Sequence, residues 1–120
     1  MAGVRKKQDK MSKYQRVTPV SKEYAETQLN LVTGEELCLL LLGLCEQENW
    51  EWAQSVYLKY IYDDDHWVAS AAITGLGHLA RISGQLDKET VVKSLTDLIE
   101  VKPSLEGKVH DTLNDIEMFL

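Results

Sequence analysis

The sequence predicts an all-α fold in which three antiparallel helix pairs stack side by side as a short α-solenoid. Good helix formers such as leucine, alanine, glutamate and lysine are common, while the 120 residues include only two prolines. Apolar residues recur at spacings of three and four along most of the chain, which is the period of an amphipathic helix. The second, fourth and sixth expected helices begin near positions 34, 65 and 104, at intervals of roughly 31 and 39 residues that are typical of helical repeats.

Polar capping residues mark the starts of the first three helices. The first is expected to begin after Ser21. Thr33 and Glu36 have the spacing of a capping box, which predicts a second helix that runs to about residue 46. The apolar run at residues 37–42 covers every side of that helix and predicts burial on most of them. Asn49 is expected to cap a third helix with apolar residues at 50, 53, 56, 57, 60 and 61.

The remaining three helices are also bounded by clear signals. The fourth is expected to be capped by Asp64 or Asp65 and closed by Gly84. Asp87 is expected to cap the fifth, and Pro103 suits the first position of the sixth. Short connections between successive helices predict that the first and second, third and fourth, and fifth and sixth form antiparallel pairs.

The fourth expected helix has a face made mostly of small residues. A glycine inside a helix costs roughly 0.5–1 kcal/mol relative to alanine, so Gly75 and Gly77 require a structural reason. The expected reason is the close approach of another backbone, as in a helix with neighbours on both sides. The predicted buried face comprises Val68, Ala69, Ala71, Ala72, Ile73, Gly75, Leu76, Gly77, Leu79, Ala80 and Ile82.

Charge divides the chain into two parts. Residues 1–16 carry six lysines and arginines and one aspartate, a net of +5, and are expected to form a basic, disordered N-terminal tail. Residues 17–120, the expected single folded domain, carry seven bases and 18 acids, a net of −11. So acidic a domain repels nucleic acid and attracts basic proteins. With no apolar window of about 18 residues and no secretory signal, we expect a cytoplasmic protein that does not bind membranes.

The cysteine and histidine spacings do not predict an enzyme. Cys38 and Cys45 are seven positions apart on one expected helix, about 10 Å, which is too far for a disulfide, and they are expected to be reduced core thiols. No zinc-ligand spacing, EF-hand loop or phosphate-binding glycine loop is present. We therefore expect a protein without catalytic activity, metal or other cofactor.

The fourth expected helix resembles the inner helix of a HEAT repeat. Asp65, Val68, Ala72 and Leu76 match the D-x-x-V-x-x-x-A-x-x-x-L arrangement of that repeat. The chain departs from it at Ala69, where HEAT repeats usually carry arginine, so no aspartate–arginine ladder between repeats is expected. The resemblance implies that the solenoid is HEAT-like.

A wider resemblance covers residues 33–120. The segments Trp50-x-Trp52-x-Gln54, 76–81 (LGHLAR), 84–87 (GQLD) and the acidic helix 111–119 are similar to small HEAT-like immunity proteins encoded beside bacterial polymorphic or contact-dependent toxins. This resemblance implies a cytosolic protein that binds the cognate toxin domain in a 1:1 complex and neutralises it.

Eight residues are candidates for binding such a partner. Six acids flank the third expected helix and could form one acidic rim that clamps basic side chains, or they could be solvated helix caps. Trp50 and Trp52 point to opposite sides of that helix, and Trp52 is expected to be the more exposed. The candidates are Glu46, Glu48, Glu51, Trp52, Tyr62, Asp63, Asp64 and Asp65.

These observations predict a toxin inhibitor. A nuclease is the most natural target, because its cleft must be positive to bind its substrate, and an acidic surface can cover that cleft. The alternative is a general HEAT-like adaptor or assembly factor with no toxin partner. A HEAT-like glycosylase would need a cationic groove, which the net charge of −11 opposes.

Overall fold

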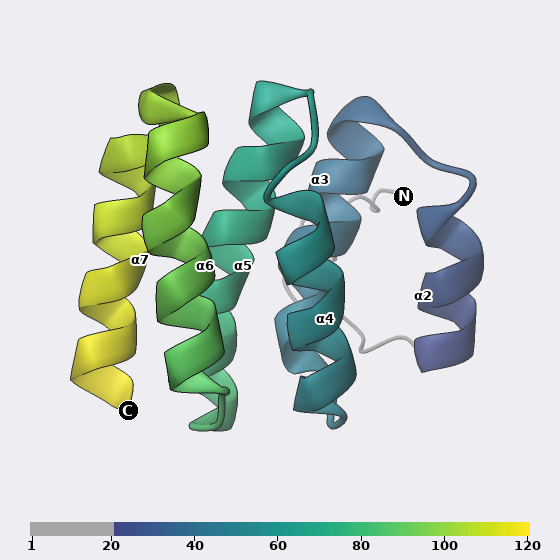
Figure 1. Cartoon of the computed structure of the whole chain (residues 1–120). Helices are drawn as coiled ribbons and strands as arrows, with labels where there is room; N and C mark the ends of the chain where they lie inside the picture. The colour runs from purple at the N-terminus through teal and green to yellow at the C-terminus, as the bar shows by residue number, and fades with distance from the viewer. Residues whose placement is uncertain (1–20) are drawn as a thin grey trace, which may run out of the picture.

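Helices and short turns account for all of residues 21–120, the part of the chain that the computed structural model describes (Figure 1). The predicted all-α class is confirmed there, with no strand among these residues. The predicted basic tail at residues 1–16 lies outside them. The helices are α2 (Lys22–Leu29), α3 (Gly34–Gly43), α4 (Trp50–Tyr60), α5 (His66–Ser83), α6 (Lys88–Val101) and α7 (Glu106–Phe119), with 3-10 turns η1 (Leu44–Glu46) and η2 (Pro103–Leu105).

Successive helices run antiparallel, and α5 lies at the centre of the arrangement (Figure 1). One side of α5 packs against α3 and the other side packs against α7, while α4 packs across it. Helix α6 packs on α7, and α2 lies at the end next to α3. The turns therefore alternate between two ends of the molecule, and residues in consecutive turns lie at opposite ends.

Side-chain caps fix four of the helix starts as predicted. Each of the four cap side chains accepts a hydrogen bond from a main-chain N–H of the first turn. The pairs are Ser21 with Tyr24, Asn49 with Trp52, Asp65 with Trp67, and Asp87 with Thr90. Gly84 ends α5 in the left-handed conformation with φ 67°, which also agrees with the sequence.

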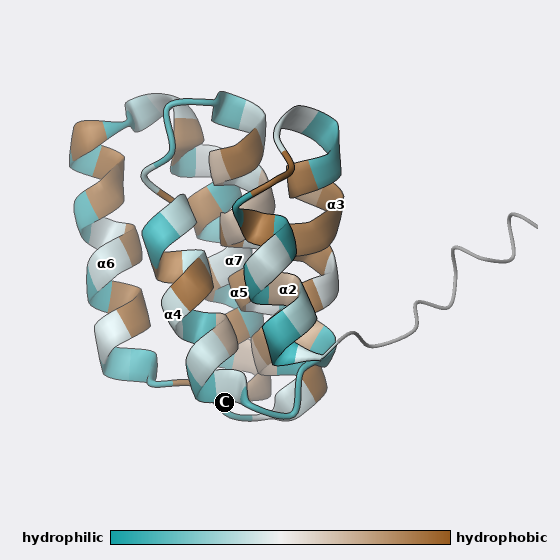
Figure 2. Cartoon of the chain, turned by 90° about the vertical axis from the view of Figure 1, so that its right-hand side faces the viewer, coloured by the Kyte–Doolittle hydropathy of each residue, from teal (hydrophilic) through white to brown (hydrophobic). Residues whose placement is uncertain are grey.

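The predicted capping box at Thr33 is wrong. The Thr33 side chain makes no cap hydrogen bond, although the residue does precede the helix. A capping box requires helical backbone angles directly after the cap, whereas Gly34 has φ 57°. Burial of α3 on most sides is also wrong, because its packing partners leave Leu39 64% exposed. Figure 2 shows the hydrophobic stretch along α3.

The small residues of α5 make room for side chains rather than for another backbone. A Cβ atom on Gly75 would meet the ring of Tyr57, which is fully buried and donates its hydroxyl hydrogen bond to the Leu41 carbonyl. A Cβ on Gly77 would meet Asp115 and Thr112 of α7. The expected close approach of another backbone is therefore wrong at both glycines, while the expected helices on both sides of α5 are present. Of the predicted buried face, only Ile82 is exposed.

No helix within residues 21–120 combines the length and the hydropathy needed to cross a bilayer.

Candidate protein-binding site

The six candidate acids lie at opposite ends of the molecule. Asp63, Asp64 and Asp65 follow the C-terminal end of α4, at the top of Figure 1. The three glutamates, Glu46, Glu48 and Glu51, lie around its N-terminal end. Helix α4 has 11 residues and is about 16 Å long, so the single acidic rim considered from sequence does not form. All three glutamates are exposed, but they belong to a separate surface.

Residues 62–65, which we call the acidic turn, have a defined local structure. Asp63 accepts a hydrogen bond from the Asp65 N–H at 2.8 Å, and Asp65 accepts one from the Trp67 N–H at 2.9 Å. The Lys102 ammonium donates to the main-chain carbonyls of Tyr62 and Asp63, not to a carboxylate. Among residues 21–120 none of the three aspartates forms a salt bridge. Their negative charge is therefore available to a partner.

Tyr62 lies at the surface as expected, with 46% of its area exposed. Its position beside the aspartates places an aromatic ring at the edge of the acidic turn. Aromatic side chains of this kind are frequent anchors in protein interfaces.

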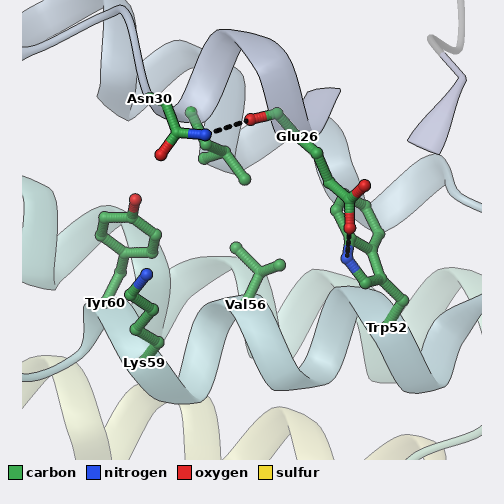
Figure 3. Close-up of a pocket in the computed structure, with 7 residues that line it drawn as sticks. Glu26, Asn30, Trp52, Val56, Lys59 and Tyr60 are labelled. Atoms are coloured by element: carbon green, nitrogen blue, oxygen red, sulfur yellow. Dashed lines mark hydrogen bonds between the residues drawn. The ribbon is translucent and has the colours of Figure 1, made fainter. Parts of the chain in front are cut away.

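Trp52 has a structural contact that the sequence did not reveal. Its indole N–H donates to the Glu26 carboxylate at 3.1 Å (Figure 3). The Lys22 ammonium lies 5.9 Å from the ring centroid. Trp50 and Trp52 are both half-buried and both pack against the core, so the predicted difference in exposure is not observed. Trp52 joins α2 to α4.

The contact between α2 and α4 borders a groove of about 400 Å³ (Figure 3). Val56 lies between Trp52 at one end and Tyr60 at the other, and the Asn30 side chain is held by the Glu26 carbonyl. The lining residues are Glu26, Leu29, Asn30, Trp52, Val56, Lys59 and Tyr60. Its opposite charges, Glu26 and Lys59, do not favour one sign of partner.

The exposed tryptophan of this protein is Trp67, which the sequence analysis did not select. It is 72% exposed, and its ring meets His66 edge to face with centroids 5.4 Å apart. The helical spacing indicates this exposure, because Trp67 lies in line with Ser70 and Thr74 rather than with the apolar residues of α5. The half-exposed positions of those two residues agree with that register.

Two shallow hollows meet at Trp67. The first, which we call the acidic hollow, has about 340 Å³ and is lined by Gly34, Glu35, Cys38, Asp65 and Trp67. The second, which we call the apolar hollow, has about 430 Å³ and is lined by Cys38, Leu42, His66, Trp67, Ser70, Ala71, Thr74 and Lys108. Trp67 and Cys38 line both, so the indole stands where the two hollows adjoin.

The pKa values of both thiols, Cys38 and Cys45, are raised. Burial raises the pKa of Cys38, and the carboxylates of Asp65, Glu35 and Asp63 raise it further. Two of these carboxylates, Glu35 and Asp65, line the acidic hollow together with the Cys38 thiol. Cys45 lies in the core, where burial raises its pKa to about 11. Both thiols are free, as predicted, although Cys38 lies at the surface hollows rather than in the core.

Comparison with protein families, with curated proteins and with solved structures gives no match to this chain. The resemblance to HEAT-like immunity proteins therefore stays a prediction. Within residues 21–120 no group of three or more histidine, cysteine, aspartate or glutamate side chains is arranged to hold a metal ion.

Proposed function

We propose that this protein is a cytoplasmic immunity protein that binds one basic bacterial toxin domain and blocks it without catalysis of its own. The observation that carries the proposal is the acidic turn, where three adjacent aspartates, Asp63 half-buried and the other two exposed, lie in a domain of net charge −11 and none of them forms a salt bridge with a described cation. Tyr62 and Trp67 provide exposed aromatic surface on either side of these charges.

The proposed mechanism is occlusion of a positive cleft. A nuclease binds phosphates through lysine and arginine, and the same side chains attract a carboxylate surface of similar charge density. Charges at the rim of an interface act mainly on the association rate, while buried aromatic anchors act mainly on dissociation. In this proposal the aspartates guide the toxin, and the aromatic side chains hold it.

The helix arrangement supports a HEAT-like α-solenoid as the scaffold. Helices α3, α5 and α7 lie side by side with α5 between the other two, and α4 and α6 pack on this layer. Stacked pairs of this kind place their turns at two ends, and each end offers several turns to a partner. The acidic turn and the N-terminal end of α3 lie at the same end.

The experiment is co-purification with the toxin domain encoded beside this gene, followed by a nuclease assay and association kinetics. We expect the triple change Asp63→Asn, Asp64→Asn and Asp65→Asn to slow association at low salt by about tenfold or more. Asparagine keeps the oxygen with which Asp65 caps α5, so the comparison tests charge rather than folding.

The matched control removes the same charge from the opposite end of α4 through Glu46→Gln, Glu48→Gln and Glu51→Gln. We expect a smaller effect on association from this variant. Equal slowing by both variants would mean that net charge alone guides the toxin, and an unchanged rate in the aspartate variant would refute the role of the acidic turn.

A further inference from the structure

We infer that the acidic hollow holds an arginine side chain of the protein partner, stacked on the Trp67 indole, while an apolar side chain of the same segment fills the apolar hollow. The inference rests on the proposed function in that it takes the partner to be a basic protein. It adds a contact site that includes Trp67, Glu35 and Cys38, none of which belongs to the candidate acids and aromatics predicted from sequence.

Trp67 presents most of its ring to solvent. Its ring is 72% exposed, and its described aromatic contact is with His66, which is also exposed. In contrast to Trp67, the apolar side chains of α5 that face the core, such as Val68 and Leu76, are almost completely buried. An indole that is mostly exposed and lines two hollows has ring surface free for a second side chain, as a cation–π or apolar contact requires.

The charged side chains that line the acidic hollow are carboxylates. Glu35 and Asp65 line it, and Asp63 acts on the same thiol through its charge. The N-termini of α3 and α5 each contribute about half a positive charge at this end. The Lys102 ammonium, which donates to the Asp63 carbonyl, adds one positive charge nearby, and the three full negative charges still exceed that charge and the two halves together. The hollow therefore favours a cation.

The two hollows differ in the sign of the charged side chains that line them. Lys108 lines the apolar hollow, together with the aliphatic surfaces of Leu42 and Ala71. A second cation is disfavoured there, whereas an apolar side chain can contact Leu42, Ala71 and the indole. In an extended segment, residues two positions apart lie on the same side. The pattern that fits adjoining hollows is thus arginine, any residue, then an apolar residue.

Arginine fits this site better than lysine. Its planar guanidinium can stack on the indole and at the same time donate hydrogen bonds to Glu35 or Asp65 at the edge of the plane. Lysine has a compact ammonium that remains strongly hydrated and does not stack.

The test uses the full chain labelled with nitrogen-15 and a short probe peptide, acetyl-Gly-Arg-Gly-Leu-Gly-amide. The Trp67 indole signal is assigned as the one lost in a Trp67→Phe variant. We expect that signal to shift saturably, with a dissociation constant in the millimolar range that NMR can measure. The same peptide with citrulline, which is planar and neutral, is expected to bind about tenfold more weakly. Equal binding of the two peptides, or shifts at Trp52 and not at Trp67, would overturn the inference.

Protein variants test the same contacts from the other side. The pair Glu35→Gln and Asp65→Asn is expected to weaken the arginine peptide about tenfold, and both amides keep the shape of the hollow. The pair Glu48→Gln and Glu51→Gln removes the same charge at the opposite end and is expected to leave peptide binding unchanged. If the second pair weakens binding as much as the first, the contact is non-specific attraction and the inference is wrong.

Failure here is distinguishable from failure of the proposed function. If the toxin domain binds a Trp67→Ala variant as tightly as the original chain, the Trp67 contact is wrong while the immunity function stands. If the arginine peptide binds at Trp67 but the neighbouring toxin domain does not bind at all, the immunity function is wrong while the contact stands.

Discussion

Replacing Gly75 with alanine should destabilise the fold, although the same change stabilises most exposed helix positions. The new Cβ would lie 2.5 Å from Tyr57 Cζ, where ordinary contacts exceed 3.4 Å. The ring cannot move away easily, because Tyr57 is fully buried and its hydroxyl donates to the Leu41 carbonyl. Overpacking of this kind costs about 1–3 kcal/mol, and we expect the upper part of that range. Helix propensity returns up to about 1 kcal/mol.

The expected net loss is about 2 kcal/mol in the free energy of unfolding, which corresponds to a fall in Tm of about 8–16 °C for a domain of this size. Urea and thermal unfolding measure both quantities. Gly107→Ala is the matched control, since a Cβ there meets nothing within 4 Å, and this variant should gain about 0.5–1 kcal/mol. Gly77→Ala should fall between them, because the closest atom belongs to the movable Asp115 carboxylate at 2.9 Å. A Gly75→Ala variant as stable as Gly107→Ala would show that Tyr57 does not fill this space.

Three further predictions follow from single contacts. Thr112→Val should cost about 1 kcal/mol in urea unfolding, because the buried Thr112 hydroxyl donates to the Ile73 carbonyl across the α5–α7 contact. Trp52→Phe removes the hydrogen bond to Glu26, so hydrogen exchange should become faster in α2, whereas Trp67→Phe should leave α2 exchange unchanged. Stability should fall as pH rises above about 8.5, because an unfolded cysteine ionises there while the pKa of Cys45 in the fold is about 11. The unfolded chain then binds fewer protons than the folded one, and urea unfolding at pH 8 and pH 10 should show a smaller decline in a Cys45→Ala variant.

Local chemistry made most of the helix boundaries predictable. A cap such as Asn49 or Asp65 acts through a hydrogen bond to a residue two or three positions later, so the sequence contains both partners. Gly84 ends α5 because glycine adopts a positive φ without strain. The Thr33 side chain makes no cap hydrogen bond, and the Gly34 that follows it has a positive φ, a conformation that no spacing rule includes.

The contacts between helices could not be predicted in the same way. The pair of glycines in α5 correctly indicated close neighbours, but a spacing pattern does not identify what occupies the space. At Gly75 the neighbour is the Tyr57 ring, 18 positions earlier in the chain. Thr112 can be buried because its hydroxyl donates to the Ile73 carbonyl, 39 positions away in the chain. The sequence does not show that this partner is within reach, so burial of Thr112 was not predicted. Both facts depend on tertiary packing.

Trp52, in the first turn of α4, and Trp67, in the first turn of α5, show why residue type alone could not identify the proposed binding surface. Trp52 has an acidic neighbour, but that neighbour is Glu26 of its own domain, which takes the indole N–H and fixes the ring against α2. Trp67 has a similar acidic setting in Glu35 and Asp65, yet its ring remains open and adjoins two hollows. An aromatic ring already held by an internal hydrogen bond would lose that bond on binding a partner, whereas Trp67 has no such contact to break among the described side chains. Binding energy at the acidic end should therefore come from Trp67, and substitution of Trp52 should affect α2 before it affects a partner.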